Sequence, residues 1–430
     1  KNGDRQTTAA KVTFLSTALD ELFVGEVEGQ QIIGSASQLA RQGLVGRITY
    51  NYEQRYLVEG NFRYDGSSNF PRNHRWGFFP SFSLGWNIAK ENFIKDNLAF
   101  SFINRLKIRG SWGILGNDWV GFSPFPYLNQ FNFGYTKITI GNKLVSMVTP
   151  SAIANPDITW EKATTSNIGL EAMFWNGLLG IEIDGFIKRT TEILAQPTLA
   201  VPQTFGASLP LLNQAIVENS GFEISLSHEQ HLEKFYYRIK PNITFSSSRI
   251  VYMPENQVNE NLRRSGRTQD YYGFGYQAIG LFQSYEEIEK SPVQTFGNVQ
   301  PGDIKYADIS GPAGVPDGRI DAFDRTRIGN SSVPKITYGV ALDAGYGSFD
   351  FSALLQGVGR SSLNFSGDPG WAFASQLLVV GSVYEHHRDR WTPENTGASY
   401  PRLFLNNNNN KQTSSYWIKD ANYLRVKSIS

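Results

Sequence analysis

Residues 168–188 read IGLEAMFWNGLLGIEIDGFIK, and this stretch predicts an antiparallel β-hairpin. Asn176-Gly177 is a dipeptide typical of tight hairpin turns, and apolar residues alternate with others on both sides of it. On the returning strand, Ile181, Ile183 and Ile187 share one face, opposite Glu182, Asp184 and Lys188. A period of two predicts strands whose two faces differ in polarity.

The same alternation recurs along most of the chain. Further strands are predicted at residues 47–53, 56–65, 82–88, 106–112, 222–226, 235–245, 336–342 and 349–355. Short turns are expected near 54–55, 175–178, 229–234 and 345–347. The sequence therefore predicts an all-β, antiparallel fold.

The composition excludes several classes of protein. The 430 residues include 40 basic and 39 acidic side chains, for a net charge of +1, and no cysteine. Without cysteine there are no disulfides, thiol nucleophiles or Cys-ligated metal sites, and the charge balance argues against a nucleic-acid partner. Aromatic residues reach 13% and glycines number 41, which is typical of strand-rich chains.

The ends and faces of the predicted strands favour a membrane barrel over a soluble β-sandwich. The strands are expected to run about ten residues, with Tyr, Trp and Phe near their ends, as in outer-membrane barrels with aromatic girdles and a polar lumen. A soluble β-rich carbohydrate-binding or glycan-cleaving protein is the alternative from another class. It would bury Ile181, Ile183 and Ile187 between two packed sheets.

The connections between the predicted hairpins are long, near 65–77, 116–163, 190–219, 249–334 and 359–415. Outer-membrane barrels have short turns on the periplasmic side and long loops on the extracellular side, which is the asymmetry predicted here. We expect 249–334 to be extracellular and Asn406–Asn410 to form a disordered loop tip. The chain begins Lys1-Asn2 and ends inside a predicted strand, so we expect an internal piece of a longer protein.

Several motifs resemble the SusC/RagA-type TonB-dependent transporters of Bacteroidota. They occur in the family's order from about residue 43 to the end: RYDGSSNF at 63–70, RWGFFPS at 75–81, LKIRGSWG at 106–113, WEK at 160–162, NIGLE at 167–171, PGDIKYAD at 301–308, DGRID at 317–321, RWTPEN at 390–395 and WIKDANYLR at 417–425.

This resemblance implies a segment of a 22-stranded outer-membrane β-barrel with long extracellular loops and short periplasmic turns. On this resemblance, residues 1–430 are one partial barrel domain, in which residues 1–42 are poorly defined. The family's plug domain and last strands are expected to lie outside this sequence. It also implies nutrient import, of oligosaccharides or peptides, with a SusD-like lipoprotein and the TonB-ExbB-ExbD complex as partners and outer-membrane lipid around the wall. A siderophore-type receptor is a second alternative, which leaves these motifs unexplained.

Asp308, Asp317, Asp321 and Asp324 form the best candidate metal site, because closely spaced carboxylates suit Ca²⁺. The family often has a calcium-loop-like run here, but residues 310–316 separate Asp308 from Asp317-Gly318. The other interpretation is a Gly/Pro-rich turn with solvated acids.

Aromatic residues in the long loops are candidate ligand or partner contacts: Tyr271, Tyr272, Phe274 and Trp371. Packing among the loops would explain them equally well. For 65–68 and 160–162, a role at the strand ends is favoured over carbohydrate contact.

No motif indicates catalysis, so the chain is predicted not to be an enzyme. A nucleophile elbow and a phosphate-binding loop are both absent from the sequence. Neither His386-His387 nor His228-x-x-His231 has a convincing set of further metal ligands, so zinc is not expected.

Overall fold

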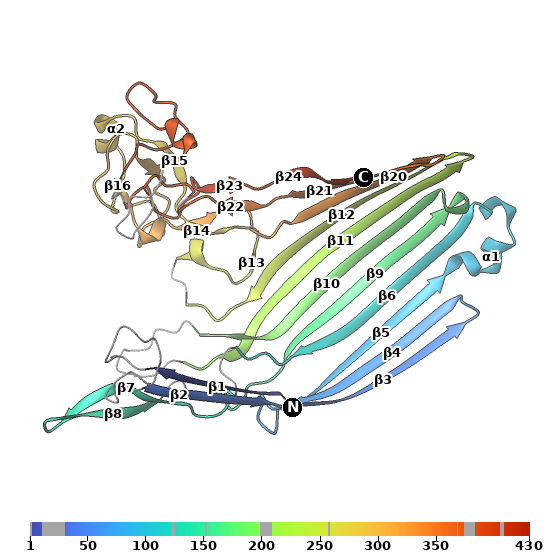
Figure 1. The fold of residues 1–430 in the computed structure, drawn as a ribbon, viewed down its shortest axis with the longest axis horizontal. Coiled ribbons are helices and arrows are strands. Elements are labelled where there is room, and N and C mark those ends of the chain that lie inside the picture. The colour runs from blue at the N-terminus through green and yellow to red at the C-terminus, as the bar shows by residue number, and fades with distance from the viewer. Residues whose placement is uncertain are drawn as a thin grey trace, which may run out of the picture.

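The computed structural model describes residues 2–10, 31–121, 125–150, 153–197, 209–256, 259–367, 369–373, 383–404 and 408–430. Its main feature is a 12-stranded antiparallel sheet that curves across the molecule (Figure 1). The long strands are β3 (Arg41–Tyr52), β4 (Tyr56–Ser67), β5 (Trp76–Asn87), β6 (Ile103–Asn117), β9 (Glu161–Phe174), β10 (Leu179–Ala195), β11 (Leu212–Leu232), β12 (Phe235–Tyr252), β20 (Ile336–Tyr346), β21 (Phe349–Gly359) and β24 (Tyr423–Ile429).

Each long strand pairs with the next long strand along the chain, from β3 at one edge to β24 at the other. At one end of the sheet, which we call the turn end, tight turns join β3 to β4, β9 to β10, β11 to β12 and β20 to β21. The connections from β6 to β9, β10 to β11, β12 to β20 and β21 to β24 leave from the opposite end, the loop end, whereas the connection from β5 to β6, which contains α1 (Asn92–Lys95), lies at the turn end (Figure 1). This up-and-down order confirms the predicted antiparallel fold and the asymmetry of its connections.

Three details differ from the sequence-based expectations. β10, β11 and β12 have 17, 21 and 18 residues rather than about ten, because they continue beyond a membrane-spanning length toward the loop end. The expected turn at 229–234 shrinks to Glu233 and Lys234, where Glu233 adopts a φ of 47°. The connection from β5 to β6 holds a short helix, α1 (Asn92–Lys95), that the strand periodicity did not predict.

One face of the sheet carries exposed apolar side chains on strand after strand. Ile183 of β10 lies opposite Leu170 of β9 and Ile224 of β11, and Ile224 lies opposite Ile243 of β12. Ile183 and Ile187 are 39% and 53% exposed, so they are not packed between two sheets. The soluble alternative is therefore wrong on its own criterion, since such a continuous exposed apolar face needs a lipid environment.

The loop end carries a folded module built from two connections. Residues 253–335 join β12 to β20, residues 360–422 join β21 to β24, and we call their described parts the loop module. It contains β13 (Arg267–Thr268), β14 (Gly273–Gly275), β15 (Ala278–Leu281), α2 (Tyr285–Glu289), β16 (Val293–Gln294), β17 (Ile304–Tyr306), β18 (Arg319–Ile320), β19 (Thr326–Ile328), β22 (Ser362–Asn364) and β23 (Ile418–Asp420). Short strands pair within it, as β14 with β19 and β15 with β17.

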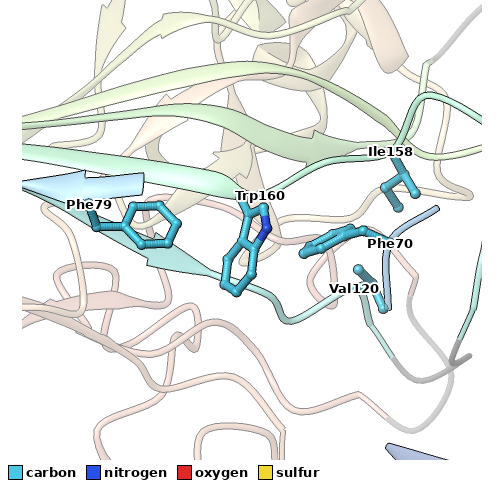
Figure 2. Packing of buried hydrophobic residues seen from close by; sticks show 5 residues of the cluster. All are labelled: Phe70, Phe79, Val120, Ile158 and Trp160. Carbon is cyan, nitrogen blue, oxygen red and sulfur yellow. The ribbon is translucent and has the colours of Figure 1, made fainter. Parts of the chain in front are cut away.

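Two clusters of buried apolar residues lie at the loop end. The first joins Phe70, Phe79, Val120, Ile158 and Trp160, which come from the ends of different strands (Figure 2). The Trp160 ring packs between Phe70 and Phe79, at centroid distances of 5.1 and 5.2 Å. The second cluster is the centre of the loop module, around Tyr306 and Trp417. Buried packing is thus concentrated where the strands end.

Two further hairpins lie outside the main sheet: β1 (Asn2–Ala10) with β2 (Gln31–Leu39), and β7 (Phe131–Ile140) with β8 (Lys143–Pro150). Among the helices of the described residues, none has the length and apolar character needed to cross a membrane.

Candidate ligand-binding cavity

The face of the sheet opposite the apolar one is lined by polar and charged residues, many of them in ion pairs. Arg109 of β6 is central, because its guanidinium reaches both Glu171 Oε1 at 3.1 Å and Asp184 Oδ2 at 2.6 Å. Arg238 of β12 pairs in the same way with Asp343 of β20, at 2.9 Å. These pairs join neighbouring strands across a polar surface, which we call the polar wall.

A cavity of about 1080 Å³ lies between the polar wall and the loop module. Residues of β9 to β12 form one side of it, including Asn167, Lys188, Asn219 and Ser248. The other side comes from residues 264–274 and 325–335 of the β12–β20 connection. Two hydrogen bonds tie this side to β12, since Gln269 N donates to Ser248 O at 2.7 Å and Ser248 Oγ donates to Gln269 Oε1 at 3.0 Å.

Three of the four aromatic residues predicted as contacts line this cavity: Tyr271, Tyr272 and Phe274. Each is half-buried, and the Tyr271 and Phe274 rings pack at 5.0 Å. Burial raises the pKa of the Tyr271 hydroxyl, so it remains a neutral donor at physiological pH. Whether these rings contact a ligand stays a prediction, but their position is the one that a ligand contact requires.

Trp371 lies elsewhere. Its ring meets Trp417 edge-on at 6.5 Å and Lys411 Nζ lies 5.8 Å from its centroid, so it packs against the core of the loop module. The structure does not bring it to the cavity, and its proposed contact with a partner stays a prediction.

The core of the loop module contains a buried polar network. Asp303 is fully buried, with Arg402 Nε 2.7 Å from Oδ1 and Asn410 Nδ2 2.9 Å from the same atom. Asn410 Oδ1 also accepts from Ile304 N at 2.8 Å, and Asn409 Nδ2 donates to Ile304 O at 2.9 Å. These bonds connect the two connections that build the module.

This network corrects one prediction. The run Asn406–Asn410 was expected to form a disordered loop tip, but Asn409 and Asn410 are fully buried. Their amide groups provide both donors and acceptors, which is what a buried backbone segment without a regular strand partner needs. Asn406 and Asn407 lie outside the described residues.

The four aspartates of the candidate calcium site accept hydrogen bonds from the backbone of their own loop. Asp308 accepts from Asp317 N and Gly318 N, Asp317 from Arg319 N, and Asp321 from Phe323 N. Asp324, fully buried, accepts from Ile309 N, Ser310 N and Asp321 N.

These bonds give the carboxylates a role in shaping the loop. In the part of the chain that the structure describes, no three His, Asp or Glu side chains are grouped so that they could hold a metal ion. Calcium at these residues stays a prediction, which is tested by the effect of Ca²⁺ and of a chelator on protease cleavage of residues 303–328.

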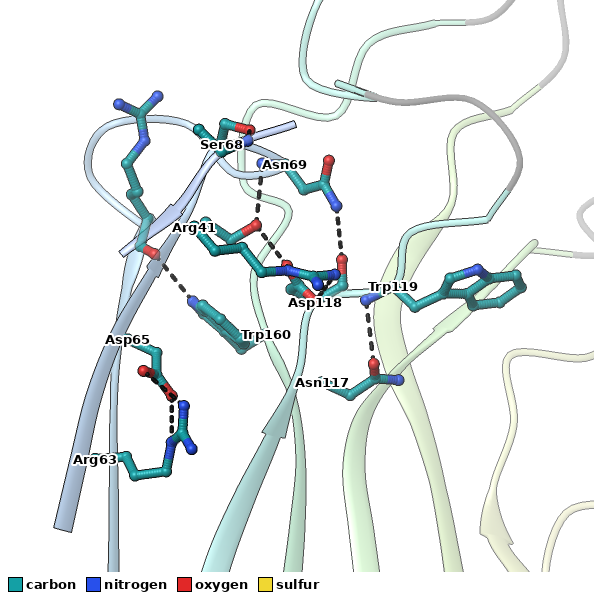
Figure 3. Close-up of polar contacts among 12 residues, drawn as sticks. Arg41, Arg63, Asp65, Ser68, Asn69, Asn117, Asp118, Trp119 and Trp160 are labelled. Atoms are coloured by element: carbon teal, nitrogen blue, oxygen red, sulfur yellow. Dashed lines mark hydrogen bonds and ion pairs between the residues drawn. The ribbon is translucent and has the colours of Figure 1, made fainter. Parts of the chain in front are cut away.

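The motif residues at the loop ends of β4, β6 and β9 make structural contacts. Asp118 binds the Arg41 guanidinium at 2.6 and 2.8 Å and accepts from Ser67 Oγ at 2.6 Å, while Asn69 Nδ2 donates to Asp118 O (Figure 3). Trp160 Nε1 donates to Arg75 O at 3.1 Å. The interpretation of 65–68 and 160–162 as strand-end residues is therefore favoured over carbohydrate contact.

The sequence did not single out the cationic residues around the cavity. Lys188, Arg264, Arg325 and Lys335 converge there from β10 and from well-separated parts of one connection. Lys188 was correctly placed on a polar strand face, but no local signal relates it to Arg264 or Arg325. Their convergence depends on how the connection folds back over the wall.

A sheet with an exposed apolar face, a polar inner wall and long loops at one end defines a segment of a transmembrane β-barrel. Residues 31–427 match the family described as TonB dependent receptor-like, beta-barrel, and the chain belongs to this family. It is thus part of an outer-membrane barrel.

Similar proteins include the TonB-dependent receptor SusC of Bacteroides thetaiotaomicron, 30% identical over 396 residues, and the TonB-dependent receptor P3 of Formosa agariphila, 28% identical over 405. Each alignment covers 90% of this chain and 37% of the relative, so the chain spans little more than a third of their length. Among solved structures, the RagAB peptide transporter shares the fold, with a TM-score of 0.72 at 17% identity over 99% of this chain and 45% of that one.

Proposed function

We propose that this chain forms the wall and outer loops of an active outer-membrane importer of nutrients, with oligosaccharides as the cargo. The observation that carries this proposal is the cavity of about 1080 Å³ between the polar wall and the aromatic residues of the loop module. A sugar ring presents hydroxyl groups at its edge and C–H groups on its faces. The amide and hydroxyl side chains of the polar wall can bind the hydroxyl groups of the sugar, and the aromatic rings of the loop module can pack against its C–H faces.

Membership of the family supports a proposal for sidedness and energy supply. The loop end faces the outside of the cell and the turn end faces the periplasm, as in outer-membrane barrels with long extracellular loops. Cargo would be captured with a SusD-like lipoprotein at the loop end. Energy would come from the TonB-ExbB-ExbD complex through a plug domain. The similarity to SusC supports this arrangement, and none of these steps requires a catalytic residue.

Peptides are the second candidate cargo. A solved structure with the same fold is described as the RagAB peptide transporter. The amide side chains of Asn167, Asn219 and Gln269 around the cavity would also serve a peptide backbone.

The test combines aromatic substitutions with a glycan panel. In the full-length protein with its SusD-like partner, Tyr271→Ala and Phe274→Ala are compared with Tyr285→Ala, whose side chain is exposed on α2 of the same module. Loss of one stacking contact should weaken binding of the cognate glycan about tenfold, whereas Tyr285→Ala should not change it. If both cavity variants bind and import the glycan like the wild type, the cavity is not the cargo site.

A further inference from the structure

The cavity is lined by more positive than negative charge. Four cationic side chains, Lys188, Arg264, Arg325 and Lys335, face one carboxylate, that of Glu223. Lys188 and Glu223 belong to the polar wall, and the other three belong to the β12–β20 connection. Positive charge therefore approaches the cavity from both of its sides.

In the described part of the chain, one of these cations forms an ion pair with an acidic neighbour. Lys335 Nζ lies 3.2 Å from Asp270 Oδ2. Arg325 Nη2 donates to the carbonyl oxygen of Phe274 at 3.2 Å, and the Arg264 guanidinium lies 5.4 Å from the centre of the Phe274 ring. Among the described residues, Lys188, Arg264 and Arg325 have no carboxylate within ion-pair distance.

Elsewhere on the polar wall, many cationic side chains form ion pairs with carboxylates. Arg47 pairs with Glu59 at 2.6 Å, Arg109 with Asp184 at 2.6 Å and Arg238 with Asp343 at 2.9 Å. The wall thus cancels these charges across neighbouring strands, but at the cavity three of the four cations form no ion pair among the described residues, and Lys188 acts on Glu161 of β9 only from beyond ion-pair distance. Cations of one sign around a concave site concentrate the potential there and attract anions.

We propose that the cavity takes an anionic oligosaccharide, with uronate or sulfate groups at the cations and sugar rings against the aromatic side chains. This inference rests on the proposed function as an importer. Aromatic rings on both sides favour a sugar over an acidic peptide, since Phe186 of the wall lies across the cavity from the ring pair of Tyr271 and Phe274. Guanidinium groups match carboxylate and sulfate oxygens through paired N–H donors.

The experiment compares an anionic sugar with its neutral ester, and adds a sulfated sugar and an acidic peptide as further anions. Binding of a hexagalacturonate and of its methyl ester to the full-length protein is measured by calorimetry at low and at physiological salt, alongside a sulfated carrageenan hexasaccharide and hexaglutamate. At least one anionic sugar should bind about tenfold or more tightly than the neutral ester, and its affinity should fall as salt rises.

Substitutions test whether the charge-dependent binding depends on the cations of the cavity. Lys188→Gln and Arg325→Gln should each weaken binding of the anionic sugar about tenfold and weaken binding of the neutral ester much less. Lys240→Gln is the matched control. Lys240 lies on the same face of β12 as the cavity residue Ser248, but outside the cavity, and it makes no ion pair among the described residues. It should change neither ligand.

Other outcomes separate the two proposals. Equal binding of the acid and its ester would overturn the anionic preference and leave the oligosaccharide importer standing. Preferential binding of hexaglutamate would overturn the sugar and support an acidic peptide. If no sugar binds and the full-length protein also fails to support growth on any glycan, both proposals fall.

Discussion

Gly169 shows how a single missing side chain shapes the polar wall. In the sheet it lies between Arg109 of β6 and Asp184 of β10, opposite both. A Cβ at this position would lie 2.6 Å from Asp184 Oδ1 and 2.9 Å from Arg109 Cζ. Arg109 therefore reaches across β9 to Asp184 because β9 carries no side chain there. The glycine of the NIGLE motif thus has a packing role.

Gly169→Ala should break or displace this ion pair. We expect the free energy of unfolding of the folded barrel to fall by about 1–3 kcal/mol, as for other insertions of a methyl group into filled space. Denaturant unfolding of the full-length protein in detergent measures it. Gly185→Ala is the control, because its Cβ would lie 3.8 Å from Ile168 and meet no crowding. Equal losses from both substitutions would contradict the packing argument.

Asn410→Ala tests the buried network of the loop module. The substitution leaves Ile304 N and a carboxylate oxygen of Asp303 without this partner, which costs about 1–3 kcal/mol for each group. Hydrogen exchange of residues 303–306 should become faster and the module should be cleaved sooner by protease. Asn408→Ala, at an exposed neighbour, should leave both unchanged. Unchanged exchange in Asn410→Ala would show that the network does not hold the module together.

At the scale of elements, the alternation of apolar and polar residues was enough to predict most long strands and their turns. Asn176-Gly177 forms the turn expected of it, with φ angles of 54° and 94°. The interior of the loop module was not predictable in this way. Its partners are far apart in the chain, as are Asp303 and Asn410, and its strands of two to four residues are too short to show a period.

The candidate site was also predictable only in part. Tyr271, Tyr272 and Phe274 were candidates because aromatic side chains in a long loop can make ligand contacts, and they line the cavity. Trp371 gave the same signal yet packs inside the module. Composition identifies residues able to make a contact, but long-range packing decides which of them face the cavity.

A lysine should have opposite effects on the two faces of β10. Ile183→Lys places a charge on the lipid-facing side and should cost about 2–4 kcal/mol near the middle of the membrane. The yield of folded protein in the outer membrane should fall accordingly. Glu182→Lys, one residue away on the polar wall beside Glu171 and Ser225, should assemble normally. A similar yield for both variants would contradict the assignment of faces.

At the scale of the whole molecule, the sheet has two edges. Among the described strands, β3 pairs only with β4 and β24 only with β21 along their length. Lipid offers no hydrogen-bonding partner to the N–H and C=O groups of such edges, so a membrane-spanning sheet must close. A closed barrel therefore needs strands in addition to those described here.

Residues 31–430 produced alone should therefore aggregate or remain unfolded in detergent, whereas the same residues within the full-length protein should give a compact barrel. Gel mobility of heated and unheated samples and size-exclusion chromatography distinguish the two. A stable, monomeric barrel from residues 31–430 alone would contradict the open edges.

The cavity is roofed by a single connection, residues 253–335, while its floor belongs to strands that cross the membrane. Exchange of that connection between relatives could alter the choice of cargo without disturbing the span beneath it. Under the proposed function, cargo selection would depend on this connection together with wall residues such as Lys188, so changes in selectivity would leave the lipid-facing residues untouched.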